Sequence, residues 1–109
     1  VNNAAFQMAQ QKFEDIPEEQ IRRTFDTNIL GYIWLAQAAV PHLGEGDSII
    51  NTGSIVGLTG NPLLIDYTAT KSAIHAFTKS LASGASGSTA WCPARSGRPT
   101  SRPPCPWRK

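Results

Sequence analysis

Apolar side chains recur at every fourth position in the first half of the chain: Ile21, Phe25, Ile29 and Ile33. This spacing is typical of the buried face of an α-helix, so it predicts a helix over residues 17–40. Pro17 and the two acidic residues that follow it suit a first helical turn, and Asp15 is the expected cap. Pro41 ends this helix.

Short apolar runs bounded by turn residues predict strands on either side of this helix. Residues 1–5 are typical of a strand that enters a loop, and residues 48–52 form a short apolar strand. A loop then spans residues 55–65, and helical spacing returns over residues 66–81. Strand, helix, strand, helix is the order of a parallel sheet with crossover helices. Such a sheet needs several strands, so we expect an α/β chain that forms one slice of a larger sheet.

The chain has 109 residues, which allow one domain at most. Its composition differs between two parts of the sequence. Residues 1–82 carry five basic and eight acidic side chains, whereas residues 83–109 carry five basic ones, no acidic one and five of the eight prolines. The second composition predicts a disordered tail. Its Cys92 and Cys105 fit neither a metal motif nor a disulfide framework. We find no secretory leader or long apolar run, which makes a cytoplasmic location the expectation.

Chemistry-bearing side chains gather in the second half. Tyr67 and Lys71 are four positions apart on the expected helix 66–81 and therefore share a face. A phenol is a weak acid or base at neutral pH, and a neighbouring ammonium stabilises its phenolate form. Ser54 follows the strand 48–52, at the end where α/β sheets bind ligands.

Each of these features has a plain structural interpretation when it stands alone. Most Tyr-x-x-x-Lys pairs are a half-buried tyrosine beside a solvated lysine, and a serine after a strand is often turn chemistry. Asn28 inside the first helix is disfavoured unless it has a partner or a task. Taken together and in this order, the residues indicate proton exchange with a carbonyl oxygen, which suits a hydride-transfer enzyme.

These motifs resemble the classical short-chain dehydrogenase/reductase family, in its glucose-dehydrogenase-like and general-stress branch. The matching segments are Asn2-Asn3-Ala4-Ala5, Thr27-Asn28, Ile50-Asn51-Thr52-Gly53-Ser54 and Tyr67-Thr68-Ala69-Thr70-Lys71. The resemblance covers residues 1–82. It implies the central portion of a Rossmann-like, doubly wound parallel sheet. It also implies reversible oxidoreduction of a small-molecule alcohol or carbonyl with NAD or NADP.

The resemblance also implies roles for single residues. Tyr67 is the expected general acid/base. Lys71 activates it and holds the nicotinamide ribose. Ser54 positions the substrate oxygen, and Asn28 anchors a water in a proton relay. On the cofactor side, Asn3 and Ala4 are expected beside the adenosine.

The chain departs from the family pattern in two respects. Ala5 replaces the usual glycine, which costs stability if the position needs a positive φ. No T-G-x-x-x-G-x-G loop is present, although that loop brings backbone amides to the cofactor pyrophosphate. We therefore expect a fragment without the N-terminal cofactor-binding half, inactive by itself. In the intact family, helices matching residues 17–40 and 66–82 form a dimer or tetramer interface.

The tail fits a shifted reading of the same coding sequence. The family continues with Gly-Ile-Arg-Val-Asn-x-Val-x-Pro-Gly-Pro-Val-Trp-Thr-Pro. When the third base of each codon is read with the next two bases, residues 84–88 allow Gly-Ile-Arg-Val. In the same frame, Trp91 followed by Cys92 must give Val, and residues 92–99 allow Pro-Gly-Pro-Val-Trp-Thr-Pro. We hypothesise a frameshift near Ser83, which the coding DNA tests.

Three functions remain open at this point. The chain is an oxidoreductase by descent, a non-catalytic remnant that keeps the four catalytic residues, or a small protein that binds through its basic tail. Such a tail attracts polyanions without sequence preference, and the chain has no nucleic-acid reading module. We expect no specific nucleic acid and no membrane among its partners.

Overall fold

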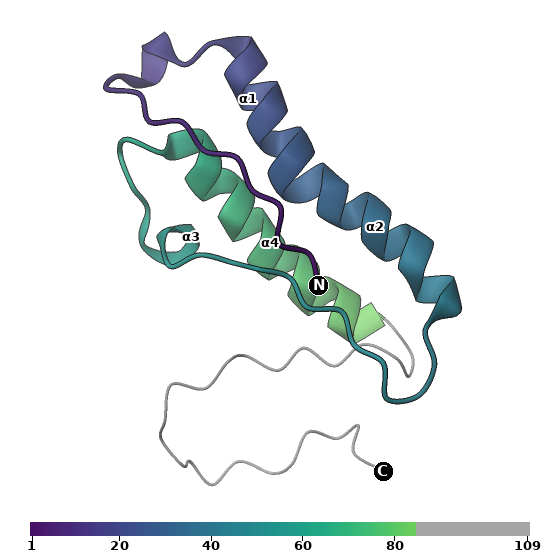
Figure 1. The fold of residues 1–109 in the computed structure, drawn as a ribbon. Coiled ribbons are helices and arrows are strands. Elements are labelled where there is room, and N and C mark those ends of the chain that lie inside the picture. Colours follow the sequence, from purple (N-terminus) through teal and green to yellow (C-terminus); the bar gives the residue numbers. More distant parts are fainter. Residues whose placement is uncertain (85–109) are drawn as a thin grey trace, which may run out of the picture.

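A long helical rod dominates the computed structural model, which describes residues 1–84. The rod consists of α1 (Glu18–Phe25), a π-helical turn η2 (Asp26–Leu30) and α2 (Gly31–Ala39), without a break between them. A 3₁₀ turn, η3 (Val40–His42), contains Pro41 and follows directly. The helix predicted for this part of the chain is therefore confirmed (Figure 1).

The start of the rod differs from the prediction. Pro17 is the N-terminal cap of α1, with extended backbone and no side-chain cap hydrogen bond. Asp15, the expected cap, lies in a separate 3₁₀ turn, η1 (Phe13–Asp15). Proline fixes the backbone entry into the helix and has no N–H that needs a partner, so α1 begins at Glu18 without a carboxylate cap.

The second long helix, α4 (Ile65–Gly84), runs past its predicted end at residue 81. Ser83 and Gly84 therefore belong to α4 and not to the tail. The rest of the predicted disordered tail, residues 85–109, lies outside the described residues. A single helical turn, α3 (Val56–Thr59), lies within the expected loop and ends at Gly60, whose φ of 81° suits glycine.

The expected parallel sheet is reduced to one bridge. Asn2 and Asn51 pair in the parallel sense, with Asn2 N donating to Ile50 O at 2.8 Å and Thr52 N to Asn2 O at 3.0 Å. No longer strand occurs within residues 1–84, so the predicted portion of a doubly wound sheet is corrected to this contact. A pair of parallel segments without neighbouring strands lacks the partners that would extend the ladder.

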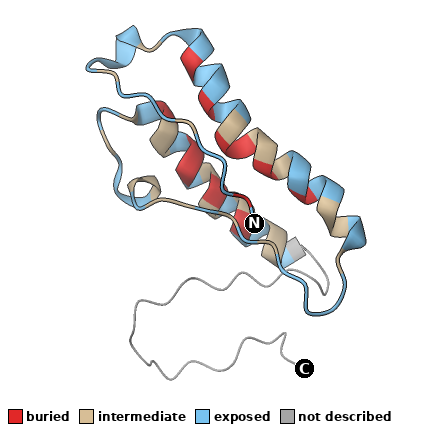
Figure 2. Cartoon of the chain, in the orientation of Figure 1, coloured by how far each residue is buried: buried red, intermediate tan, exposed pale blue. Residues whose placement is uncertain are grey.

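Burial is concentrated where the rod faces α4 (Figure 2). The buried positions of the rod recur every four residues: Gln20, Thr24, Asn28, Tyr32 and Ala36. The predicted buried stripe lay one residue later along the chain. That prediction is partly wrong, because Ile21 and Phe25 are each 36% exposed. Ile29 is buried as predicted and packs with Tyr32.

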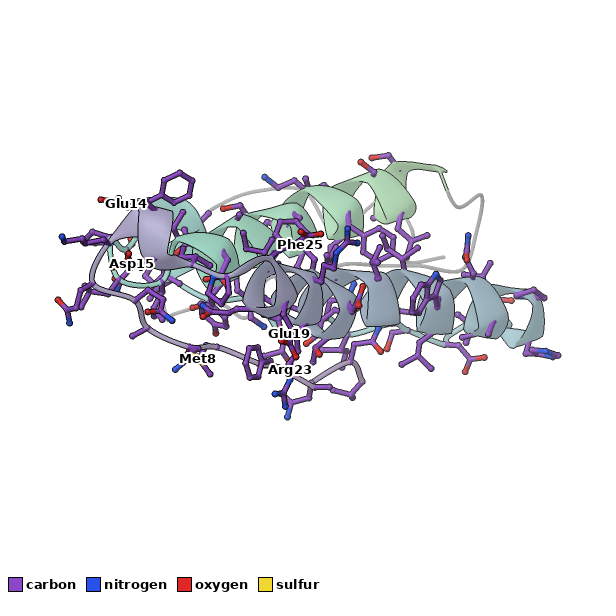
Figure 3. The ribbon with its side chains drawn as sticks, turned by 90° about the horizontal axis from the view of Figure 1, so that it is seen from above. Met8, Glu14, Asp15, Glu19, Arg23 and Phe25 are labelled. Atoms are coloured by element: carbon purple, nitrogen blue, oxygen red, sulfur yellow. The ribbon has the colours of Figure 1, made fainter. Side chains whose placement is uncertain are left out.

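Hydrogen bonds explain why a polar stripe faces inward. Thr24 Oγ1 donates to Asp66 Oδ2 at 2.7 Å, and Asn28 Nδ2 donates to Thr70 Oγ1 at 3.1 Å. Buried polar groups need such partners, and α4 supplies them on this face. The side chains of Phe25 and Arg23 project from opposite sides of α1 (Figure 3).

Candidate active site

Lys71 lies at the centre of the expected site and is 1% exposed. Its Nζ donates to the backbone oxygen of Thr52 at 2.9 Å. The same atom lies 5.6 Å from the centroid of the Tyr67 ring and 5.7 Å from that of Tyr32, within the range of cation–π attraction. Tyr67 and Lys71 therefore lie on the same side of α4, as their spacing predicts.

The Lys71 charge has little compensation. Burial lowers the pKa of the Lys71 ammonium, because the charged form is withdrawn from water. Within residues 1–84 one ion pair forms, and it is the exposed pair between Glu18 and Arg22. No carboxylate in this part of the chain thus neutralises Lys71, and its field is available to an oxygen that gains negative charge.

Tyr32, on the rod, is a further member of this cluster. It is 1% exposed, and its hydroxyl donates to the backbone oxygen of Ala4 at 3.0 Å. Burial raises the pKa of the Tyr32 phenol, and the nearby Tyr67 raises it further. Tyr32 therefore stays a neutral donor that holds the N-terminal segment against the rod.

Ser54 is fixed through its backbone. Its carbonyl oxygen accepts from Gly57 N at 3.1 Å and lies 3.2 Å from His75 Nε2. A Cβ at Gly57 would lie 2.8 Å from the backbone carbon of Lys71, so this glycine permits the close approach of α3 to α4. The structure thus places Ser54 beside the helix that carries Tyr67, and its role in positioning the substrate oxygen remains a prediction.

Asn28 has the partner that its position inside a helix requires. It is fully buried in η2, where its Oδ1 accepts from Phe6 N at 2.7 Å and its Nδ2 donates to Phe6 O at 2.8 Å. The second Nδ2 hydrogen goes to Thr70 Oγ1. The side chain therefore joins three segments of the chain, and its role in a proton relay remains a prediction.

The expected cofactor-side residues lie next to one another. Asn3 is exposed, and its Oδ1 accepts from Thr52 Oγ1 at 3.0 Å. Ala4 offers its backbone oxygen to Tyr32. No residue other than glycine has a positive φ within residues 1–84, so Ala5 carries no backbone strain in place of the family glycine.

Asp66 fixes the first turn of α4, one residue before Tyr67. It is 5% exposed, and its Oδ2 accepts from Thr24 Oγ1 and from Gln20 Nε2, the latter at 3.3 Å. Its Oδ1 is buried and has no partner among the described residues. These hydrogen bonds therefore hold the backbone next to Tyr67 against α1.

Sequence reasoning missed three residues of this cluster, namely Tyr32, Thr52 and His75. Tyr32 lies one helical turn after Asn28, and His75 one turn after Lys71, so helical spacing could have found both. Thr52 acts through its backbone oxygen, which carries no signal in the side chains.

The arrangement provides a phenol, a buried ammonium beside it and a hydroxyl on a tightly docked turn. These groups can exchange a proton with a substrate oxygen and stabilise the charge that develops there. The remaining Nζ hydrogens of Lys71 can donate to further oxygens, since among the described residues the acceptor of Nζ is Thr52 O.

The chain belongs to the short-chain dehydrogenase family, whose model matches residues 1–89. The glucose and ribitol dehydrogenase of Daucus carota is 53% identical over 81 residues, which are 74% of this chain and 28% of that protein. The NADPH-dependent aldehyde reductase 1 of Arabidopsis thaliana is 50% identical over 82 residues, 75% of this chain and 28% of the reductase.

A solved structure agrees with this assignment. The short-chain dehydrogenase/reductase of the glucose/ribitol dehydrogenase type from Brucella melitensis superimposes with a TM-score of 0.74 at 28% identity. The match covers 79% of this chain and 36% of that one. The α/β class is thereby supported.

The chain thus spans about 28% of the length of these curated relatives. Within the described part, no helix combines the length and apolarity needed to cross a membrane.

Proposed function

We propose that this chain carries the catalytic segment of an NAD(P)-dependent oxidoreductase that interconverts alcohols and carbonyl compounds. The observation that supports this most directly is the enclosed Lys71 ammonium, which lies 5.6 Å from the Tyr67 ring without a carboxylate partner in residues 1–84. The family membership supports an oxidoreductase reaction, and the site has groups that suit it.

Tyr67 is the general acid/base of the proposed reaction. When a carbonyl is reduced, the Tyr67 hydroxyl donates its proton to the oxygen that becomes the alcohol, and in the reverse direction it takes that proton back. Lys71 stabilises the phenolate that results. Ser54 donates a hydrogen bond to the same substrate oxygen and fixes its distance from Tyr67.

The residues present fit part of a nicotinamide cofactor, which supplies hydride chemistry when it is bound. Lys71 Nζ retains two hydrogens beyond the one shared with Thr52 O, and ribose hydroxyls are suitable acceptors for them. Asn3 contacts Thr52 and Ala4 contacts Tyr32, and both would face the adenosine side of the cofactor. The amides of a Gly-rich loop, which hold the pyrophosphate in such folds, are not part of this sequence.

A second candidate is therefore a non-catalytic form of the same segment. We expect the 109-residue chain by itself to turn over no substrate. Titration of the chain with NADH and NADPH, followed by the fluorescence of the reduced nicotinamide, tests this expectation. Enhancement that saturates in the micromolar range would show a working cofactor site and would contradict it.

Activity is tested in a graft that supplies the absent residues. In this graft, the 82 matched residues of the Arabidopsis reductase are replaced by the matching stretch of this chain, and NADPH consumption is followed with an aldehyde. We expect turnover within about tenfold of the parent reductase, because the catalytic groups are retained. A graft that binds NADPH but leaves the aldehyde unreacted would contradict the proposed function.

We also propose that the intact enzyme is a homo-oligomer that associates through the rod and α4. An apolar groove of ≈370 Å³ lies between the two helices, lined chiefly by Ile33, Val40, Pro41 and Phe77. Exposed apolar side chains on the rod, among them Phe25 and Trp34, need cover in a stable protein. Sedimentation of the graft beside its parent tests this, and a monomeric graft from an oligomeric parent would contradict it.

A further inference from the structure

Side chains on one face of α4 hold the segment that ends in Ser54. Lys71 Nζ donates to Thr52 O at 2.9 Å, and one turn later His75 Nε2 lies 3.2 Å from Ser54 O. At the next turn, Thr78 Oγ1 accepts from Asn51 Nδ2 at 3.0 Å. The helix therefore contacts this segment at three successive heights, and His75 makes the contact with Ser54 itself.

The acceptor in this contact determines which ring nitrogen of His75 carries a hydrogen. A backbone carbonyl only accepts hydrogen bonds, so Nε2 must carry the hydrogen. The neutral ring with its proton on Nε2 donates this bond, and so does the imidazolium. The His75 ring therefore donates to Ser54 O and supports the Ser54 backbone.

Gly53 provides the space that the ring occupies. A Cβ at Gly53 would lie 2.7 Å from His75 Cε1, closer than real Cβ atoms approach, and 3.1 Å from its Nε2, which is a tight contact. The φ of Gly53 lies outside the left-handed region that favours glycine. The ring in its present place, and not backbone strain, is thus what favours glycine at this position.

We infer that His75 is a positioning residue of the proposed reaction: its Nε2–H, seated against Gly53, sets where Ser54 presents its hydroxyl to the substrate. The inference rests on the proposed function for its consequence in catalysis. The contact between His75, Gly53 and Ser54 stands on the structure alone.

The catalytic consequence is tested in the graft with two substitutions at one position. His75→Leu keeps much of the side-chain volume but removes the donor, whereas His75→Gln keeps a donor of similar reach. We expect His75→Leu to lower kcat about tenfold or more, because a small displacement of a positioning group is costly, with the Kd for NADPH unchanged. His75→Gln should recover most of the rate. Equal rates for the two variants would overturn the inference.

The structural basis is tested separately through thermal unfolding of the same graft. Gly53→Ala should lower the Tm by at least about 2–4 °C, corresponding to the clash with the ring. Combining it with His75→Ala should remove this loss relative to His75→Ala alone, since the ring that collides is gone. A Gly53→Ala loss that is the same in both backgrounds would overturn the inference.

The two measurements separate this inference from the proposed function. If the graft has no turnover while the Gly53–His75 coupling is found, the proposed function fails and the contact is confirmed as structural only. If turnover depends on Tyr67 but the coupling is absent, the proposed function stands and the role of His75 is wrong.

Discussion

At the scale of single residues, the buried ammonium of Lys71 is the feature that connects structure to chemistry. An amine that is 1% exposed and has no carboxylate beside it within residues 1–84 is costly to keep charged. A protein retains such a charge where it has a task. In the proposed reaction, the task of Lys71 is to support an oxygen that gains negative charge, next to the Tyr67 ring.

This burial gives stability a defined pH dependence. The pKa of Lys71 is lower in the folded state than in the unfolded chain, so the folded state releases its proton first. Stability should therefore rise with pH between the lowered pKa and about 10.4, the ordinary lysine value. Below that window the effect is constant. Denaturant unfolding of the graft between pH 7 and 10, compared with its Lys71→Met variant, measures the difference.

The Lys71→Met graft should lack this rise, and identical pH profiles for the two proteins would contradict the account. The range ends at pH 10 because Tyr32 acts in the opposite direction. Its pKa is raised in the folded state, so its contribution to stability is lost as pH rises above the ordinary tyrosine value of about 10.

At the scale of elements, the contact between the rod and α4 determines which face of each helix is buried. The sequence predicted both helices correctly, because their apolar spacing is strong. It placed the buried stripe one residue late, because apolar pattern alone ranks Ile21 and Phe25 above Gln20 and Thr24. Hydrogen bonds to Asp66 on α4 reverse that order, and a helix read by itself does not reveal such partners.

Among the side chains that join separate elements, Asn28 is the one whose substitution should reduce the free energy of unfolding most. Asn28→Ala removes hydrogen bonds to both backbone groups of Phe6 and to Thr70, and leaves buried groups without partners. We expect destabilisation of about 2–4 kcal/mol in the graft. Asp26→Ala, an exposed substitution in the same π-helical turn, is the matched control and should change stability by less than about 0.5 kcal/mol.

Chemical denaturation with both variants measures this difference. A loss at Asn28 that does not exceed the loss at Asp26 would show that the link between the rod and the N-terminal segment carries little stability.

At the scale of the whole molecule, the sheet is what the described residues lack. The order of elements in the sequence predicted parallel pairing, and the Asn2–Asn51 bridge has that sense. The extent of the sheet could not be predicted from local patterns, because a parallel ladder depends on neighbouring strands. Ile50 and Leu35 remain more than half exposed, at 54% and 61%.

The isolated 109-residue chain should therefore unfold without a sharp cooperative transition. Within residues 1–84, the buried apolar cluster consists of Ile29, Tyr32 and Ile74 with a few partly buried neighbours, which is a small core. Differential scanning calorimetry of the chain tests this, together with binding of a dye that reports exposed apolar surface. A single sharp heat-absorption peak without dye binding would contradict the expectation.

The origin of the tail also belongs to this scale and remains a proposal. Residues 85–109 lie outside the described part of the structure, so the frameshift hypothesis rests on the sequence. The coding DNA decides it, and an alternative frame that does not spell the family continuation would end it.

The measurement that tests the central claim most directly is the turnover of the graft with Tyr67→Phe. This change removes one hydroxyl and keeps the ring beside Lys71. We expect kcat to fall at least about a hundredfold, in line with the contribution of a general acid/base, while the Kd for NADPH stays within about twofold. A Tyr67→Phe graft that reduces the aldehyde at the original rate would contradict the account.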